Sequence, residues 1–419
     1  MKVTMVYCAV GVAGFNPDRL PGDREGSWIG HGAALVGSAA QDAGHYVDLI
    51  DLRQLAGWDD FDHIITENPA DVYGLSVAPV DYYSALKAVF EIKTHVPAAK
   101  IIVGGIHPSI FPDEYNFDVI DTMVTGEGEV TFPELLNDIE NLPKRIQGKK
   151  PDLAHVSWAD RDLFDYKREL TCSYTPDQQT PAVTMLAGRG CPYHCTYCQP
   201  AENAVFGKPY RMRPVDDVIA ELIYLQSEYN YKAITFWDDT FTINEKWIYE
   251  FADAYEKSGI NATIAACSRA DIICRRPEMI SRLAEIGLDW FIIGFESGSQ
   301  RLLNMIKKGT TVEQNLKAAE ICHANNIKVF ATYMYGLPTE TREESLATAR
   351  MIDKSKAEYP SPFWFLPIKG TEIYEYCDTH DLILDKETSI ARTGMFVPRI
   401  KNVDYDYILQ LMTGLRSEL

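Results

Sequence analysis

The chain has 419 residues, enough for two domains that each bury their own core, and its hydrophobic content of 46% is typical of a globular protein. Its formal net charge of −20 argues against a nucleic-acid partner, because phosphate binding needs concentrated Lys and Arg. We find neither a basic segment followed by an apolar one at the start nor a run of about eighteen apolar residues. The sequence therefore predicts a cytoplasmic protein without a membrane partner.

Strand-like and helix-like segments alternate over residues 1 to about 140. The strand-like runs are 2–8, 46–50, 72–77, 101–103 and 119–124. Helical patterns lie at about 29–43, 61–67 and 82–95, with a short piece near 109–115. This alternation predicts a five-stranded doubly wound α/β sheet, whose ligands bind beyond the carboxyl ends of the strands.

Those carboxyl ends carry glycine-rich turns. The third strand ends in Gly74-Leu75-Ser76, the fourth in Gly104-Gly105-Ile106-His107-Pro108-Ser109, and the fifth in Thr125-Gly126-Glu127-Gly128-Glu129. Each turn alone is equally well explained as a tight strand-to-helix connection. Three of them on one rim favour a ligand site, since glycine lets the backbone approach a flat ligand closely.

The Gly-Gly-x-His-Pro-Ser and Gly-Glu-Gly-Glu turns resemble the N-terminal cobalamin-binding domain that precedes one large group of radical S-adenosylmethionine (SAM) enzymes. The resemblance covers nearly all of residues 1–140 and implies a Rossmann-like cobalamin-binding domain. The Asp-x-His-x-x-Gly motif, which supplies a histidine to cobalt in other cobalamin enzymes, is absent from the sequence. We therefore expect no histidine below the metal and a turn-shaping role for His107. The implied cobalamin contacts are Ser76, Gly104, Gly105, His107, Gly126, Glu127 and Gly128.

Residues 141–180 are rich in charge, Pro and Gln, and predict a connector between two domains. Beyond them, Cys191, Cys195 and Cys198 fall within eight residues. Cysteine thiolates are the usual ligands of iron–sulfur clusters, and three of them leave one iron of a 4Fe–4S cluster open to a substrate. The alternative is a structural zinc site, for which His194 would have to supply the fourth ligand.

The Cys-x-x-x-Cys-x-x-Cys spacing resembles that of the radical SAM superfamily. The resemblance implies that SAM binds the open iron, and that the reduced cluster cleaves it to a 5′-deoxyadenosyl radical. It also implies an external electron donor of flavodoxin or ferredoxin type. Tyr197, inside the loop, is an expected SAM contact because an aromatic ring there can lean on the adenine.

The βα alternation resumes after residue 181. Strand-like runs lie at 182–187, 233–237, 263–267, 290–294, 328–333 and 363–366, and helical patterns separate them. These units predict a (β/α)6 partial barrel over 181–376, with the cysteine loop at its carboxyl rim. Residues 377–419 are expected to be an extension that covers the substrate side.

Polar motifs follow successive strands of this barrel. Asp238 and Asp239 follow the second, with a helix N-cap as the alternative, and Arg269 follows the third, with a structural salt bridge as the alternative. Glu296 and Ser297 follow the fourth, in a stretch that closely resembles the family's Gly-x-Glu-Ser-Gly-Ser. We expect all five to contact SAM. Thr339 departs from the glycine that the family carries after the fifth strand, which leaves the geometry of that turn open.

The resemblances together identify a cobalamin-dependent radical SAM enzyme, with a 4Fe–4S cluster, SAM and cobalamin as cofactors. The expected reaction is methyl transfer to an unactivated carbon of a small molecule, such as an intermediate of natural-product biosynthesis. Cyclisation, ring contraction, oxidation and sulfur insertion stay open as alternatives. Less favoured are a tRNA methylthiotransferase, which would need further cluster cysteines and a basic appendage, and a cobalamin sensor without catalysis. The sequence names no catalytic residue, substrate or oligomeric state.

Overall fold

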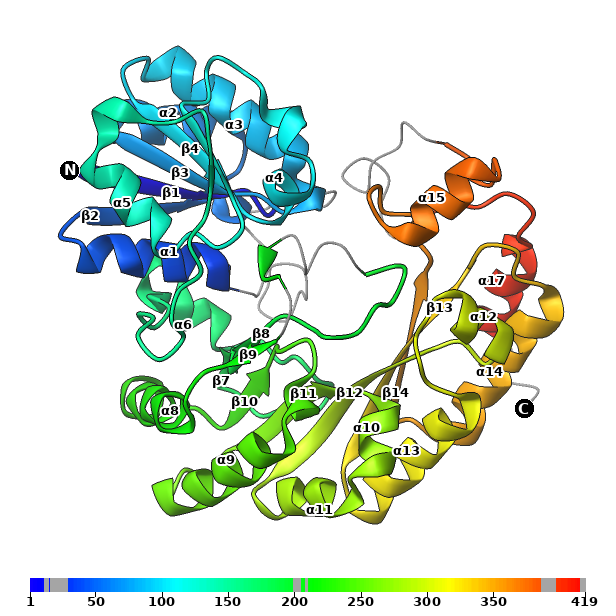
Figure 1. Ribbon diagram of the computed structural model, residues 1–419. Helices are drawn as coiled ribbons and strands as arrows, with labels where there is room; N and C mark the ends of the chain where they lie inside the picture. Colours follow the sequence, from blue (N-terminus) through cyan, green and yellow to red (C-terminus); the bar gives the residue numbers. More distant parts are fainter. Residues whose placement is uncertain (11–14, 16–28, 199–204, 208–209, 386–396, 415–419) are drawn as a thin grey trace. The chain divides into compact units, whose positions relative to one another are not determined.

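The computed structural model describes residues 1–10, 15, 29–198, 205–207, 210–385 and 397–414 (Figure 1). It divides into two compact units, which we describe separately. The described part of unit 1 is Met1–Cys172 with residues 205–207, and unit 2 holds the rest from Ser173 onwards. Within the described ranges, none of the helices combines the length and the apolar character that a membrane crossing requires.

Unit 1 is built on a parallel sheet of six strands. Their order is β2 (Tyr46–Asp51), β1 (Lys2–Tyr7), β3 (Val72–Ser76), β4 (Lys100–Gly104), β5 (Thr122–Thr125) and β6 (Arg145–Gln147). The strand order reverses at β1, so the crevice between the carboxyl ends of β1 and β3 is the place where doubly wound sheets bind ligands.

Helices cover both faces of this sheet, as the doubly wound prediction requires (Figure 1). α1 (His31–Asp42) packs with α5 (Thr131–Asn137), and α2 (Trp58–Glu67) packs with α3 (Tyr82–His95). The short α4 (Ile106–Ile110) follows β4. One apolar cluster of the unit lies where α2 and α3 meet the strands, so this face of the sheet is packed beneath its rim.

The predicted count of five strands is wrong, because β6 adds a sixth within the segment assigned to the connector. It has three residues, of which only Ile146 is apolar, and it pairs with β5 at the edge of the sheet. A strand this short has no readable periodicity, so its pairing depends on the edge that β5 offers. The connector also contains the helical turn α6 (Tyr166–Glu169).

Unit 2 carries a second parallel sheet of six strands, in sequence order. These are β7 (Ala182–Met185), β10 (Ala233–Phe236), β11 (Thr263–Ser268), β12 (Leu288–Glu296), β13 (Lys328–Tyr335) and β14 (Tyr359–Trp364). β7 and β14 are the two edges, so the sheet forms a partial barrel as predicted. Its last strand begins earlier than the predicted 363–366, because prolines 360 and 362 are tolerated in an edge strand.

The connecting helices lie along the outer face of this sheet (Figure 1). They are α8 (Val215–Tyr229), α9 (Glu245–Ser258), α10 (Ala270–Arg275), α11 (Pro277–Glu285), α13 (Val312–Ala324) and α14 (Arg342–Ser355). The short α12 (Gln300–Met305) follows β12, α15 (Glu372–Thr379) follows β14, and α17 (Tyr405–Gly414) packs against α14. Thr311 and Thr341 each form a capping box at a helix start. These caps satisfy exposed N–H groups and so fix where the loops of the carboxyl rim end.

Candidate functional site

The three-cysteine loop lies between β8 (Gly188–Arg189) and β9 (Arg211–Met212), a two-residue antiparallel pair that follows β7. Thr196 anchors it from both sides: its N–H donates to the Ile306 carbonyl at 2.9 Å, and its own carbonyl accepts from the Ile373 N–H at 3.2 Å. Cys195 is buried, whereas Cys198 is exposed. The loop therefore has a fixed frame and an accessible end.

The arrangement of these thiols fits a cluster better than a single zinc ion. Among the described residues, the one group of three His, Cys, Asp or Glu ligand atoms within 4.8 Å of one another is Asp62, Glu91 and His95 in unit 1. The cysteine Sγ atoms and His194 thus do not converge as tetrahedral zinc ligands must. In a cubane each thiolate binds a separate iron, so wider spacing is expected. His194 is exposed.

Arg269, directly after β11, reaches this loop. Its Nη1 lies 3.9 Å from Cys195 Sγ, and its guanidinium stacks 3.4 Å from the centre of the Tyr193 ring. The structural salt bridge named as its alternative is also present, because Nε donates to Asp271 Oδ1 at 3.0 Å. A further bond from Nη2 to the Lys308 carbonyl, 2.6 Å, holds the side chain in place. Its predicted contact with the SAM carboxylate stays a prediction.

Glu296, at the end of β12, is the centre of a buried charged group. Its Oε1 accepts from Lys308 Nζ at 2.7 Å and from the Tyr197 hydroxyl at 2.9 Å. The side chains of Lys308 and Glu296 are 8% and 9% exposed, so the ion pair is shielded from water. Tyr197 and Glu296, which were both predicted to contact SAM, therefore lie together in the structure. Lys308 joins them and was not predicted.

The backbone at Glu296 is unusual, with φ of +60° and a shift of strand register beside it. A non-glycine residue in the left-handed region costs free energy and marks a position worth attention. A side chain at Gly294 would come within 2.1 Å of Glu296 Oε1 and 2.6 Å of Lys308 Nζ. Glycine at 294 therefore makes room for the ion pair.

Asp238 and Asp239 differ sharply in their surroundings. Asp238 is buried and its Oδ2 accepts from the Ala187 N–H at 3.0 Å, which ties β10 to β7. Burial raises the pKa of Asp238 to about 7. Its Oδ1 is buried without a hydrogen bond from the described residues, so a polar ligand group could bond there. Asp239 is exposed.

The alternative of an N-cap for these aspartates is wrong for α9, because Asn244 caps it by accepting from the Trp247 N–H.

Ser297 is fully buried and its hydroxyl bonds the Ser299 N–H and Thr348 Oγ1. The Ser297 side chain therefore shapes its turn, and the structure does not place it with Glu296 toward a ligand. Its predicted SAM contact stays untested.

Thr339, where the family pattern has glycine, has φ of +63°, in the left-handed region that favours glycine. Arg301 holds it there, since Nη1 donates to Thr339 Oγ1 at 3.0 Å and Nη2 to its carbonyl at 2.9 Å. Beside it, the buried Glu340 accepts from the Gly336 and Leu337 N–H groups at 2.6 and 3.0 Å. The departure from the family pattern therefore leaves a well-bonded turn.

In unit 1, the predicted glycine turns share one rim at the ends of β3, β4 and β5. Gly105 has φ of +104°, and a Cβ there would lie 2.8 Å from the Val77 nitrogen. Gly126 has φ of +84°. Ser109 links the two turns: its Oγ donates to the Gly105 carbonyl at 2.6 Å and accepts from the Gly126 N–H at 2.8 Å. Sequence reasoning quoted Ser109 in the motif but gave it no role.

Small residues occupy the strand ends themselves, with Ser76, Gly104 and Thr125 last in β3, β4 and β5. A Cβ added to Gly104 would make only ordinary contacts, so packing alone does not demand glycine there. Glu127 is buried within its turn. A rim of backbone and short side chains fits a broad flat ligand such as cobalamin. The predicted contacts of Ser76, Gly104, Gly105, Gly126, Glu127 and Gly128 stay predictions.

His107 packs inside unit 1. Its side chain is buried, Nδ1 is 2.9 Å from the Tyr115 hydroxyl, and the ring stacks on Tyr82 with 4.6 Å between centroids. These contacts support the turn-shaping role and speak against cobalt ligation. The segment 9–14 after β1, where a histidine motif was sought, lies mostly outside the described residues.

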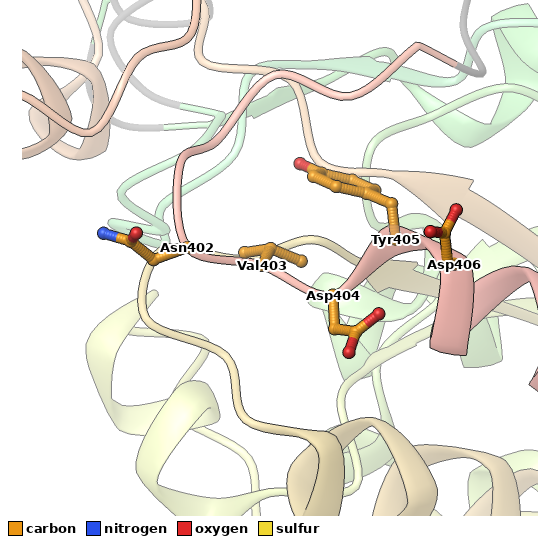
Figure 2. A pocket seen from close by; sticks show the side chains of 5 residues that line it. All are labelled: Asn402, Val403, Asp404, Tyr405 and Asp406. Carbon is orange, nitrogen blue, oxygen red and sulfur yellow. The ribbon is translucent and has the colours of Figure 1, made fainter.

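A surface hollow of about 410 Å³ beside α17 offers no comparable chemistry (Figure 2). Its two main polar side chains are engaged elsewhere. Asp404 caps α17 and pairs with Arg342, and the Tyr405 hydroxyl accepts from the Arg399 and Ile400 N–H groups. Figure 2 shows Asp404 and Tyr405 on opposite sides of the chain. The hollow is therefore a feature of the helix start.

Two protein families match separate parts of the chain. Residues 22–136 match the B12 binding domain, and residues 185–352 match the radical SAM superfamily. The first match contains the glycine rim of unit 1. The second contains all three cysteines and every predicted SAM residue.

Two relatives and one solved structure show how far the likeness extends. An uncharacterized methyltransferase of Pyrococcus horikoshii is 28% identical, over 91% of this chain and 85% of its own length. The anaerobic magnesium-protoporphyrin IX monomethyl ester cyclase of Rubrivivax gelatinosus is 24% identical, over 79% of this chain and 62% of its own length. The solved structure of OxsB, a cobalamin-dependent SAM radical enzyme, superimposes with a TM-score of 0.75 at 16% identity. The superposition covers 98% of this chain and 65% of the OxsB chain.

The radical SAM match carries with it a 4Fe–4S cluster and SAM, and the B12 match carries cobalamin. The three thiols, the buried polar group at Glu296 and the small-residue rim fit these cofactors. The chain therefore belongs to the radical SAM superfamily, among the cobalamin-dependent enzymes that join a B12 binding domain to the radical SAM domain.

Proposed function

We propose that the chain is a methyltransferase that modifies an unactivated carbon of a small molecule. The observation that carries this proposal is the three-cysteine loop at the carboxyl rim of unit 2, with Arg269 Nη1 3.9 Å from Cys195 Sγ. The cluster and SAM supply the radical that removes hydrogen, and cobalamin supplies a methyl carrier.

The residues of unit 2 bind and orient SAM in this proposal. Arg269 suits the SAM carboxylate, because a guanidinium binds a carboxylate through paired N–H donors. The buried Oδ1 of Asp238 can accept from a polar hydrogen of SAM. Lys308 and Tyr197 hold the Glu296 carboxylate in one position, so its orientation is set before the ligand binds.

The proposal extends to the surroundings of the enzyme. We place it in the cytoplasm, where a reduced donor of flavodoxin or ferredoxin type delivers the electron. Residues 377–419 are assigned to the substrate side of the barrel. The substrate is a small molecule in this proposal, since 60 acidic against 40 basic residues do not favour RNA binding.

Methyl transfer is preferred to cyclisation because of the extent of the two likenesses. The Pyrococcus relative, named as a methyltransferase, matches most of both chains, whereas the cyclase matches 62% of its own length. Cyclisation is the second candidate, since 24% identity with the cyclase runs over 79% of this chain.

Product analysis separates these outcomes. The protein is reconstituted anaerobically with iron, sulfide and cobalamin, then incubated with SAM and a chemical reductant. We expect 5′-deoxyadenosine and S-adenosylhomocysteine, and neither from Cys195→Ala. Production of 5′-deoxyadenosine alone, in every condition that includes candidate substrates, would favour the cyclase-type reaction. Absence of both products in a protein that holds the full cluster would overturn the proposal.

A further inference from the structure

The turn that presents Glu296 departs from regular strand geometry. The register with β13 shifts between Gly294 and Glu296, so Phe295 lies in a bulge of β12. Glu296 itself has φ of +60°, in the left-handed region that few residues other than glycine adopt. Such a conformation persists only where its surroundings hold it. The residues that hold this turn therefore set the direction of the Glu296 carboxylate.

Two fully buried polar side chains reach this turn from α13 and α14, which pack on each other. Asn315, on α13, donates from Nδ2 to the Phe295 carbonyl at 2.9 Å. The same carbonyl accepts from the Ser297 N–H at 2.7 Å, so the bulge has two bonds of its own. Thr348, on α14, accepts from the Gly298 N–H at 2.9 Å. The backbone on both sides of Glu296 is therefore bonded to a helix.

Thr348 lies where the turn touches α14 directly. A Cβ at Gly298 would come within 2.3 Å of the Ala347 carbonyl oxygen and 2.6 Å of the Thr348 Cα. Glycine at 298 therefore lets the backbone of the turn rest on the helix. The Thr348 hydroxyl donates to the Glu344 carbonyl at 3.1 Å, which leaves its oxygen free to accept from the Gly298 N–H. One hydroxyl thus joins the turn to the helix in a fixed orientation.

Stability alone explains Asn315 poorly. Its Oδ1 is buried and accepts no hydrogen bond from the described residues, and the second contact of its Nδ2 is Met351 Sδ at 3.5 Å. A buried amide that uses only part of its bonding capacity costs free energy, which an apolar side chain of similar size would avoid. What Asn315 adds is its bond to the Phe295 carbonyl, one residue before Glu296.

We propose that Asn315 and Thr348 are positioning residues, which hold the turn in the bulged, left-handed form that aims Glu296 at SAM. The inference rests on the proposed function, in which Glu296 contacts SAM, and adds the side chains through which α13 and α14 act on that contact. Lys308 and Tyr197 hold the carboxylate, whereas Asn315 and Thr348 hold the backbone that carries it. Neither positioning residue touches SAM, so each acts only through Glu296.

The test is a double-mutant cycle on SAM affinity in the full chain, reconstituted anaerobically with cluster and cobalamin. Thr348→Val keeps the size of the side chain and removes its hydroxyl, and Thr348→Ser keeps the hydroxyl. Glu296→Gln removes the charge that is to be positioned. Ser355→Ala is the matched control on the same helix, because its buried hydroxyl bonds the Ile352 carbonyl and the Ala357 N–H at the other end of α14. Titration calorimetry measures SAM affinity, and thermal unfolding measures stability.

We expect Thr348→Val to weaken SAM binding about fivefold or more, because the Gly298 N–H loses its acceptor and the turn relaxes. Thr348→Ser should stay within about twofold of the unaltered chain, and so should Ser355→Ala, although it also loses a buried hydrogen bond. In the Glu296→Gln background, Thr348→Val should weaken binding by less than about a further twofold, because residues that act through one group are not additive. Asn315→Leu, an apolar replacement of similar size, should repeat the behaviour of Thr348→Val in both backgrounds.

An equal loss of affinity in both backgrounds would overturn the proposal, since Thr348 and Asn315 would then act independently of Glu296. A loss that follows the melting temperature in the same way for Thr348→Val and Ser355→Ala would also overturn it, because a purely structural role predicts that result. The cycle with Asn315→Leu decides the question if Thr348→Val does not fold. Failure of the unaltered, cluster-loaded chain to bind SAM would instead contradict the proposed function, and this inference with it.

Discussion

The carboxyl rims of the two sheets are built in opposite ways. In unit 1 the strands end in Ser76, Gly104 and Thr125, and the turns depend on backbone geometry that only glycine adopts freely. In unit 2 the corresponding positions carry Asp238, Arg269 and Glu296, all buried and bonded to neighbours. The carboxyl edge of a parallel sheet can therefore be built for two kinds of recognition.

The physical reason lies in the ligands that each rim fits. A broad flat ligand needs close backbone approach, so side chains are removed. A small charged ligand needs fixed donors and acceptors in a dry site, so charged side chains are added and held by one another. Adding side-chain atoms at the rim of unit 1 should therefore weaken cofactor binding there. Removing charged side chains from the rim of unit 2 should weaken binding in that unit.

The largest effect is expected from Cys195→Ala. Loss of one of three thiolates should abolish cluster binding and SAM cleavage, because a cubane held by two ligands is poorly retained. Iron, sulfide and visible absorbance report the cluster. Cobalamin content should remain near that of the unaltered chain, since unit 1 is untouched. A variant that keeps a full cluster would show that other residues bind it.

Next comes Lys308→Met, which breaks the buried pair with Glu296. Leaving one buried charge without its partner costs about 3 kcal/mol of folding stability. SAM affinity should fall at least tenfold, or about 1.4 kcal/mol. Calorimetric titration with SAM measures it. Lys307→Met is the matched control, because Lys307 pairs with Glu372 at the surface. Equal loss in both variants would contradict a specific role for Lys308.

Gly105→Val tests the opposite principle in unit 1. At φ of +104° its Cβ would lie 2.8 and 2.9 Å from the nitrogen and oxygen of Val77, so the turn must shift. We expect about 1–3 kcal/mol of lost stability and clearly reduced cobalamin content, with the cluster retained. Gly57→Ala serves as control, since a Cβ there has open space and φ is 175°. Normal cobalamin content in the valine variant would remove Gly105 from the site.

A pH effect should arise from Glu169 in unit 1, a buried residue 3.4 Å from Arg53. Burial raises its pKa from 4.5 to about 7, against the opposing effect of Arg53. A raised carboxyl pKa stabilises the fold below about pH 4.5, and that stabilisation is lost as pH rises through 7. Over this window the loss is about 3 kcal/mol.

Thermal unfolding of the unaltered chain and of Glu169→Gln between pH 5 and 8 measures that contribution. We expect the melting temperature of the unaltered chain to fall more steeply with rising pH, because glutamine does not titrate. Parallel curves would mean that Glu169 keeps an ordinary pKa. Asp238 and Glu340 also have a pKa of about 7. They titrate in both proteins, so their effects cancel in the difference between the two melting curves.

The smallest effect concerns the turn at Thr339. Glycine there relieves about 1–2 kcal/mol of left-handed strain, but costs about 0.5–1 kcal/mol in chain entropy and loses the bond from Arg301. Thr339→Gly should therefore change stability by less than about 1 kcal/mol. Thr339→Val, which keeps the branch and loses the hydroxyl, should destabilise by about 1 kcal/mol in denaturant titration. A stabilised valine variant would mean that the Arg301 bond contributes nothing.

Sequence patterns were most informative where many residues share one period. The helix over 82–95 and the strand pairs around 72–76 and 100–104 agree with the structure within a residue, because long apolar runs admit few alternatives. The three-residue β6 and the proline-containing β14 were missed or misplaced, since pairing with a neighbour defines them.

The sequence by itself determined the two-part α/β plan, the cysteine spacing and the order of motifs along each rim, because these depend on local periodicity and on residue types at fixed intervals. The tertiary structure alone decided which side chains meet. It joined Lys308 to Glu296 and Tyr197, used Ser109 to link two turns, and connected Cys195 to Arg275 through Arg269 and Asp271. The decisive contacts, such as Lys308 with Tyr197 and Arg269 with Cys195, join residues far apart in the chain, and their distances follow from packing that no local pattern records.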